Sequence, residues 1–236
     1  MLPESKSDLT FRVSVVIPTR NRLEKLCRAL ASIEQQTCRD YEVWLVDDGS
    51  TDGTREFVES GRLAGSYPGI PSIHTLLNTQ SRGAAAARNQ ALANAEGELI
   101  AFLDDDDLWF PEYLQQQLMR MDSHPEAAAC CARHVEFDAG GRSYASDPLP
   151  LFADDDPLIY LLTDSFVHTM SVFMCRSAAF DSIGPFDETL CVVHDWDWYA
   201  RLLLCGSTIL APAGPALVGH EIPGGLEARH SASPAE

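Results

Sequence analysis

Basic residues are scarce in this sequence. It holds 17 lysines and arginines against 35 aspartates and glutamates, which gives a formal net charge of −18 over 236 residues. A protein that binds nucleic acid through a basic face needs the opposite balance, and so does one that docks electrostatically on anionic lipid. We therefore expect no nucleic-acid partner. Most of the acidic surplus should lie on the surface, and a part serves a function if some carboxylates hold a metal.

The seven cysteines lack the spacing of a metal site. None belongs to a CxxC pair, and their odd number does not suit a closed disulfide framework. The first residues, MLPESKSD, form no apolar signal region. No run approaches the roughly 18 apolar residues of a membrane span. Together these absences predict a soluble protein of a reducing, cytoplasmic compartment.

Strand and helix patterns alternate over the first half of the chain. Short apolar, β-branched runs predict strands, and apolar residues at three- and four-residue spacing predict helices. This alternation predicts an α/β fold with a mostly parallel sheet and helices on both faces. The expected strands are 11–17, 41–46, 73–77, 99–103 and 127–134, and the expected helices are 23–33, 54–60, 84–95 and 111–123.

The pattern loosens after Glu136. A long polar connection rich in glycine and proline is the kind that often forms a binding loop. His168 is expected to be a structural residue at a strand end, and from Gly214 onward glycine, proline and small polar residues predict loop or disorder. The expected later elements are a strand at 168–174, a helix at 176–183, a helix that begins at His194 and a strand at 208–211.

Four consecutive aspartates occupy positions 104–107. They follow an expected buried strand and precede Pro111, which suits the first position of a helix. Open α/β sheets bind ligands at the carboxyl ends of their strands. Like charges packed there need a counter-charge, and a divalent cation with oxygen ligands supplies one. The aspartates at 154–156 stand in a polar stretch between prolines, so we expect an exposed loop with no role.

A second acidic pair, Asp47 and Asp48, ends the expected strand at 41–46. Parallel strands place their carboxyl ends at one edge, so this pair should lie near residues 104–107. Two interpretations stay open. The sequence DDGS suits a turn with a helix cap, and grouped carboxylates suit a cation that neutralises a bound diphosphate.

Five motifs follow one another in a fixed order. They are VSVVIPTRN at 13–21, VDDGSTDGT at 46–54, RGAAAARN at 82–89, GELIAFLDDDD at 97–107 and HDWDW at 194–198. In this order and spacing they resemble the motifs of family 2 glycosyltransferases. Each motif alone is a weak signal, but five in order, from about residue 13 to about residue 204, are a specific one.

The resemblance implies a GT-A fold, a nucleotide-sugar donor and an inverting displacement assisted by Mg²⁺ or Mn²⁺. It implies one domain over 1–236, with a nucleotide-sugar-binding half at 11–135, an acceptor-side half at 136–212 and a loop or flexible tail at 213–236. The implied reaction moves a sugar, by expectation from a UDP-sugar, to a hydroxyl of a saccharide or lipid-linked acceptor. A lipid-linked acceptor would bring a cytoplasmic enzyme to the inner membrane face. The oligomeric state is not indicated.

The resemblance also implies nucleotide-binding residues. Asp48 matches the carboxylate that contacts the nucleotide base, and Arg82 and Arg88 match basic positions near the nucleotide or the sheet edge. Arg88 has the alternative of a helix arginine that pairs with an acid. The residues implied for nucleotide binding are Pro18, Thr19, Asn21, Asp48, Arg82, Asp104 and Asp105.

Asp104 and Asp106 match the outer residues of the family's D-x-D motif, and Asp106 is the expected metal ligand. Because four aspartates stand in a row, Asp105 is an alternative member of the pair. Asp107 is expected to cap the turn into the next helix. His220 is a candidate third ligand, with an exposed tail histidine as the alternative.

Asp195 matches the last acid of the family's E-D motif, the general base that takes the proton of the attacking hydroxyl. His194 departs from that pattern, because the family usually has an acid there. Asp197 is a second candidate base, on another face of the helix. Trp196 and Trp198 are candidates to stack on an acceptor sugar, with core packing expected for one of them.

Other classes of protein fit less well. A sugar-nucleotidyltransferase would need a glycine-rich loop after the first strand, and residues 18–22 contain no glycine. A haloacid-dehalogenase-type phosphatase would need an aspartate where Val46 stands. The main alternative is a non-catalytic nucleotide-sugar or glycan binder that keeps the fold, because His194 replaces an acid.

Overall fold

A computed structural model of the chain describes residues 11–138, 143–145 and 169–221. Its centre is a seven-stranded sheet in which β9 runs antiparallel to its neighbours β4 and β6, while the other pairs are parallel. The expected fold class, a mostly parallel α/β sheet, is confirmed. In spatial order the strands are β10 (Thr208–Leu210), β6 (Ala127–Cys131), β9 (Phe173–Arg176), β4 (Leu99–Phe102), β1 (Val13–Thr19), β2 (Tyr41–Asp47) and β3 (Ile73–Leu77).

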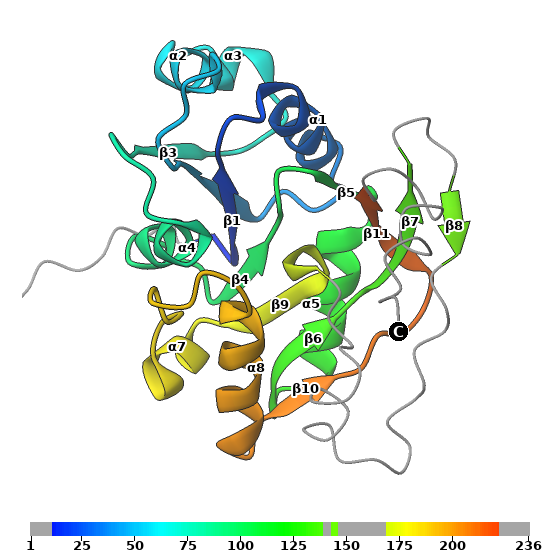
Figure 1. Cartoon of the computed structure of the whole chain (residues 1–236). Helices are drawn as coiled ribbons and strands as arrows, with labels where there is room; N and C mark the ends of the chain where they lie inside the picture. Colours follow the sequence, from blue (N-terminus) through cyan, green and yellow to red (C-terminus); the bar gives the residue numbers. More distant parts are fainter. Residues whose placement is uncertain (1–10, 139–142, 146–168, 222–236) are drawn as a thin grey trace, which may run out of the picture.

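Helices cover both faces of this sheet, and Figure 1 shows α1 and α4 on opposite sides of β1. Among the described residues no helix is long and apolar enough to cross a membrane. The helices are α1 (Leu23–Glu34), α2 (Thr54–Glu59), α3 (Leu63–Ser66), α4 (Ala84–Leu92), α5 (Tyr113–Ser123), α7 (Ala178–Ile183) and α8 (His194–Leu204), with a 3-10 turn η1 (Met170–Val172).

The central strands are buried on both faces, which explains their continuous apolar sequences. All four residues of β4 are buried, as a strand covered by helices on either side requires. The alanines of α4 let that helix approach the sheet closely, and Ala87 is fully buried. Gly97 leads into β4 where a Cβ atom would lie 2.5 Å from the backbone nitrogen of Ser14. Small residues therefore allow close packing on the sheet, at Ala87 of α4 and at Gly97 before the amino end of β4.

A second sheet of four strands lies beside the first. Its strands are β5 (Asp107–Trp109), β11 (Ala216–Glu221), β7 (Arg133–Phe137) and β8 (Ser143–Ala145), in that order. β11 is antiparallel to β5 and parallel to β7, with His220 opposite Asp107. The expectation of a loop or flexible tail from residue 213 is therefore wrong for Ala216–Glu221, because this stretch is paired on both edges. Residues 222–236 lie outside the described residues.

Two other expected strands have different bounds. The single strand expected at 127–134 is two strands, β6 and β7, which belong to different sheets and are separated by Ala132. The burial of β7 alternates along its length, unlike that of β6. β7 extends to Phe137, three residues past the end of the expected strand. The strand expected at 168–174 begins as the turn η1, and β9 follows it. The polar run at 154–156 and His168 lie outside the described residues.

An aromatic cluster seats α8 on the central sheet. Trp198 is fully buried and packs on Phe173, Phe180 and Phe186, with ring centroids 4.5 to 5.9 Å apart. Its indole nitrogen donates to the Gly184 carbonyl at 3.1 Å. Trp198 is thus the tryptophan of the pair that belongs to the core. This packing holds α8 against β9 and α7, which lie beside it in Figure 1.

Candidate active site

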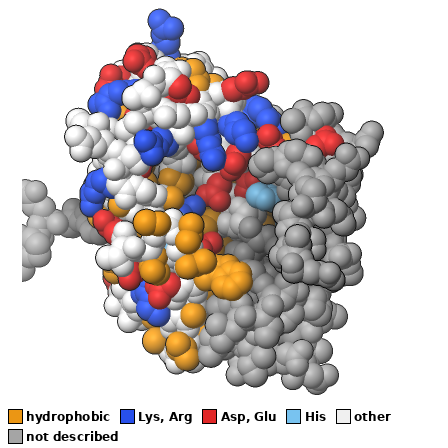
Figure 2. Space-filling view, in the orientation of Figure 1, with side chains coloured by type: hydrophobic (Ala, Val, Ile, Leu, Met, Phe, Trp, Pro, Cys, Tyr) orange, Lys and Arg blue, Asp and Glu red, His pale blue; other side chains and the backbone are white. Residues whose placement is uncertain are grey.

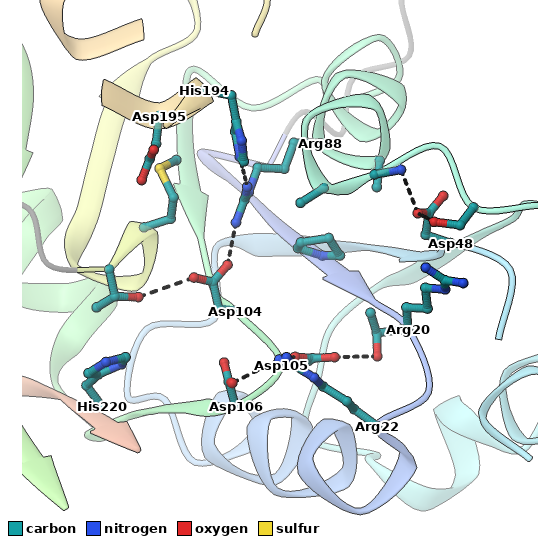
Figure 3. Close-up of a pocket in the computed structure, with 18 residues that line it drawn as sticks. Arg20, Arg22, Asp48, Arg88, Asp104, Asp105, Asp106, His194, Asp195 and His220 are labelled. Atoms are coloured by element: carbon teal, nitrogen blue, oxygen red, sulfur yellow. Dashed lines mark hydrogen bonds and ion pairs between the residues drawn. The ribbon is translucent and has the colours of Figure 1, made fainter. Parts of the chain in front are cut away.

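A cavity of about 500 Å³ opens at the carboxyl ends of β1, β2 and β4. Thr19 comes from β1, while Asp48 and Asp104 follow β2 and β4. From the other side α8 contributes Asp195 and β11 contributes His220. Figure 3 shows these labelled acids and His220 around a common space, and Figure 2 shows acidic side chains in a hollow with basic side chains along its rim. Residues far apart in sequence therefore share one polar cavity.

Neutral donors hold the carboxylate of Asp48. Its Oδ2 accepts from Ser81 Oγ at 2.7 Å and from the Gly83 nitrogen at 2.8 Å. Its Oδ1 accepts from the Arg82 nitrogen at 2.9 Å and from Asn78 Nδ2 at 3.1 Å. Burial alone raises the pKa of Asp48, but these hydrogen bonds outweigh it and leave the pKa below its usual value. Asp48 is therefore a fixed, ionised group in the cavity wall.

Asp47 has a different role from its neighbour. It is fully buried, and its Oδ1 accepts from the Ser50 nitrogen at 3.2 Å. The interpretation of DDGS as a turn is thus right for Asp47, while Asp48 alone of the pair lines the cavity.

Charged donors surround Asp105 and Asp106. Arg22 Nη1 donates to Asp105 Oδ1 at 3.0 Å and to Asp106 Oδ2 at 2.8 Å, and Thr19 Oγ1 donates to Asp105 Oδ2 at 2.7 Å. Burial raises the pKa of Asp105 above its usual value against the opposing effect of Thr19 and Arg22. Burial also raises the pKa of Asp106, and the charge of Asp107 adds to the shift. These two carboxylates carry charge that their surroundings do not fully compensate.

Asp104 joins the two sides of the cavity. Its Oδ1 accepts from Arg88 Nη2 at 2.5 Å, and its Oδ2 lies 3.3 Å from Thr169 Oγ1. The other terminal nitrogen of Arg88 lies 2.6 Å from Nε2 of His194. Arg88 is 5% exposed. The alternative interpretation of Arg88, a helix arginine paired with an acid, describes this contact.

Asp107 does not cap the helix that follows it, so that expectation is wrong. It begins β5 and is 1% exposed. Its Oδ2 accepts from Thr169 Oγ1 at 2.6 Å, and its Oδ1 lies 2.8 Å from His220 Nδ1. Burial lowers the pKa of His220, but the hydrogen bond and charge of Asp107 outweigh burial and raise it. His220 is therefore an oriented cavity residue and not an exposed tail histidine.

The two candidate bases on α8 point to different places. Asp195 lines the cavity, and its Oδ1 accepts from the nitrogen of Trp196 at 2.9 Å. Asp197 instead pairs with Arg201, whose Nε donates to Asp197 Oδ2 at 2.9 Å. Of the two, only Asp195 belongs to the described cavity wall.

Most of the residues expected at the site line the cavity, and two do not. Asn21 Oδ1 accepts from the Thr51 nitrogen at 2.6 Å, and the Arg82 side chain pairs with Glu188 at 3.0 Å. Both lie outside the cavity lining that the described residues form. The cavity residues that sequence reasoning did not single out are Arg20, Arg22, Ser81, Gly83, Ala84, Ala87, Thr169 and Met170.

Asp104, Asp106 and His220 offer two carboxylates and an imidazole to the cavity, and carboxylate oxygens are the ligands that Mg²⁺ and Mn²⁺ prefer. Asp107 bonds Nδ1 of His220, which is how carboxylates orient histidines that ligate metal through Nε2. Over the described residues no three His, Cys, Asp or Glu side chains are grouped closely enough for a preformed metal site. The donor types fit a divalent cation, and in this structure Arg22 Nη1 donates to Asp106 Oδ2.

The fold and the acid-lined cavity define a GT-A type α/β protein, and two solved structures agree. S. aureus TarS, solved in complex with UDP-GlcNAc, has a TM-score of 0.68 at 26% identity, over 95% of this chain and 62% of that one. The mannosyltransferase PcManGT from Pyrobaculum calidifontis, in complex with GDP-Man and Mn²⁺, has a TM-score of 0.70 at 21% identity, over 92% and 59% of the two chains, and supports the fold alone. The family model "Glycosyl transferase family 2" matches residues 14–183, so the chain belongs to that family.

Curated relatives agree with the family. The pre-mycofactocin glycosyltransferase of Mycobacterium tuberculosis is 33% identical over 214 residues, 89% of this chain and 42% of that protein. WfgD of Escherichia coli, a UDP-Glc:alpha-D-GlcNAc-diphosphoundecaprenol beta-1,3-glucosyltransferase, is 36% identical over 115 residues, 47% of this chain and 41% of that protein. The chain thus spans about two fifths of the length of these relatives.

Proposed function

We propose that this chain transfers a sugar from a nucleotide-diphosphate donor, by expectation a UDP-sugar, to a hydroxyl of a saccharide or lipid-linked acceptor. The acceptor oxygen bonds to the anomeric carbon as the bond from that carbon to the diphosphate breaks, with inversion. Asp195 takes the proton of the attacking hydroxyl. The nucleoside diphosphate leaves with the electron pair of the broken bond.

One observation carries the proposal: Asp195 and the aspartates that follow β4 line the same cavity from opposite sides. This arrangement provides a base on one side of a reacting sugar and a place for the diphosphate on the other. Asp48 and Thr19 extend the donor side toward β2 and β1. Arg20 is an exposed cation of the cavity wall and suits the phosphate charge.

Asp106 is the proposed metal ligand, with Asp104 and His220 as further ligands. When bound, a Mg²⁺ or Mn²⁺ ion would stabilise the charge that develops on the leaving diphosphate. The donor types and the orientation of His220 by Asp107 support this assignment. Asp105 accepts a hydrogen bond from Thr19 and is therefore less suited to be a metal ligand.

The nature of the donor is supported by relatives. The name of WfgD contains UDP-Glc, and TarS was solved with UDP-GlcNAc. Both are uridine diphosphate sugars, which favours a UDP-sugar here. The acceptor in the name of WfgD is a diphosphoundecaprenol-linked sugar, so a lipid-linked acceptor should be included in the screen.

Asp195→Asn tests the proposal, because the amide keeps the shape of the side chain and cannot take a proton. We expect wild type to transfer or hydrolyse at least one nucleotide sugar with Mn²⁺. We expect the variant to lose about 100-fold to 10⁴-fold in kcat, the usual contribution of a general base. Its affinity for the nucleoside diphosphate, measured by calorimetry, should stay unchanged.

Asp197→Asn is the matched control, since it makes the same change two residues along α8 and outside the cavity. Its kcat should stay within about threefold of wild type, because Asp197 pairs with Arg201 and is not part of the cavity lining that the described residues form. Equal losses in both variants would contradict Asp195 as the base. If wild type binds nucleotide sugars and turns over none of a full donor panel, the chain is a non-catalytic binder.

A further inference from the structure

Two buried nitrogens beside the cavity have no hydrogen-bond partner in the described part of the chain, Arg88 Nε and His194 Nδ1. Both belong to residues of one contact, in which Arg88 Nη1 lies 2.6 Å from His194 Nε2. The second terminal nitrogen of Arg88 donates to Asp104 Oδ1 at 2.5 Å. Figure 3 shows the guanidinium between His194 on α8 and Asp104 after β4. Arg88 therefore bridges the acceptor side and the donor side.

The chemistry of arginine determines the state of the histidine. A guanidinium stays protonated and has no acceptor atom, so Nε2 of His194 must accept the hydrogen bond. An accepting Nε2 places the ring proton on Nδ1. Burial lowers the pKa of His194, and the positive charge of Arg88 lowers it further. His194 is thus a neutral acceptor beside a buried cation.

The contacts with Asp104 and His194 fix the orientation of the Arg88 guanidinium. A guanidinium is planar with its donors in a fixed fork, so one partner at each terminal nitrogen fixes its orientation. Asp104 and His194 are those partners. Without the His194 acceptor, Asp104 is the one remaining partner of Arg88 among the described residues, and the first turn of α8 loses its contact with Arg88.

We propose that His194 is a positioning residue, whose Nε2 holds Arg88 so that Asp104 and Asp195 keep the spacing that sugar transfer needs. This inference rests on the proposed function, because that spacing matters for transfer only if Asp195 takes the acceptor proton. Asp195 directly follows His194 in α8. A contact that fixes the imidazole therefore also fixes the peptide that carries the base.

Two substitutions separate this role from a general need for a polar residue. The side-chain amide of Gln reaches the place of Nε2, whereas the shorter Asn reaches only the place of Nδ1. His194→Gln should keep kcat within about threefold of wild type. His194→Asn should lose at least about tenfold in kcat with an unchanged Kd for the nucleoside diphosphate, because small misplacements of reacting groups slow catalysis strongly. Equal kcat values in the two variants would overturn the inference.

A spectroscopic measurement decides the contact without relying on activity. Nitrogen-15 NMR of the wild-type imidazoles at pH 7 should show His194 neutral with its proton on Nδ1, its signals identified by their loss in His194→Gln. A proton on Nε2 or on both nitrogens would overturn the inference. If wild type transfers no sugar at all, the proposed function fails, and the tautomer still reports whether His194 holds Arg88.

Discussion

The cavity has acidic groups in two places, Asp48 after β2 and the pair Asp105 and Asp106 after β4. Neighbouring groups compensate their negative charges in different ways. Asp48 is surrounded by two backbone nitrogens, a hydroxyl and an amide, and its pKa is lowered. Asp105 and Asp106 depend on the guanidinium of Arg22, and Lys25 stands 3.8 Å from Asp106. The pKa values of both aspartates are raised. Neutral donors compensate the charge of Asp48, whereas cationic side chains compensate the charges of Asp105 and Asp106 only in part.

This difference means that the geometry around Asp48 is fixed, whereas the geometry around Asp106 can change. Backbone donors cannot leave Asp48 without unfolding the loop that carries them, so its geometry is set before a ligand arrives. Arg22 is half exposed and can release Asp106 by rotating its side chain. A cluster with spare negative charge and a removable counter-charge suits the binding of a cation. The three predictions below test this contrast.

The largest effect should come from Asp106→Asn in cation binding. We expect Mn²⁺ affinity, measured by electron paramagnetic resonance with a nucleoside diphosphate present, to fall at least about 100-fold. Even residues that only hydrogen-bond to metal ligands cost up to about that much. Asp181→Asn, an exposed aspartate on α7, is the matched control and should leave the affinity unchanged. Tight Mn²⁺ binding by Asp106→Asn would remove Asp106 from the metal site.

Asp48→Asn should have a middle-sized effect, on stability. The amide leaves backbone donors unsatisfied, so the free energy of unfolding at pH 7 should fall by about 1 to 3 kcal/mol. The folded pKa of Asp48 lies below its unfolded value of about 3.9, so the stabilisation is complete above that value and is lost as pH falls through the folded pKa. Urea denaturation from pH 7 to pH 3 should show the difference in stability between the two proteins become smaller at the acidic end. A constant difference over that range would contradict the assignment.

The smallest effect should be a gain in stability, opposite in sign to the loss expected for Asp48→Asn. In metal-free protein at neutral pH, Asp106→Asn removes a charge that the folded state disfavours, so stability should rise by up to about 0.5 kcal/mol. The same urea assay with chelator present measures it. A clear loss of stability would mean that Arg22 fully compensates the charge of Asp106. Asp106 would then be as well compensated as Asp48.

Short sequence patterns predicted the strands and helices that depend mainly on neighbouring residues. Val13–Thr19 and Leu99–Phe102 are mostly apolar because both faces of each strand are covered. The carboxyl ends of Tyr41–Asp47 and Leu99–Phe102 were expected to bring Asp48 and Asp104 together. The helix that begins at His194 also has its expected start. These residues lie within motifs whose spacing the sequence displays directly.

What the sequence did not predict depends on contacts between distant segments. Arg22 stands in a polar turn, and only the fold brings it to Asp106, 84 residues away. Thr169 reaches Asp107 across 62 residues. β11 looked like a tail because glycine and proline surround it. Its signal was the short apolar pair Leu217 and Val218, both buried, beside His220.

β11 has a consequence for the order in which the molecule is assembled. His220 meets Asp107 across 113 residues, and Glu221 meets Arg28 across 193. Contacts of such separation form late, since long loops must close first, and on the ribosome they cannot form until the later segment emerges. The seven-stranded sheet can gather most of its strands from residues 13–176, but the cavity gains its last wall only with residues 216–221. A nascent chain therefore has an incomplete site until residues 216–221 have emerged.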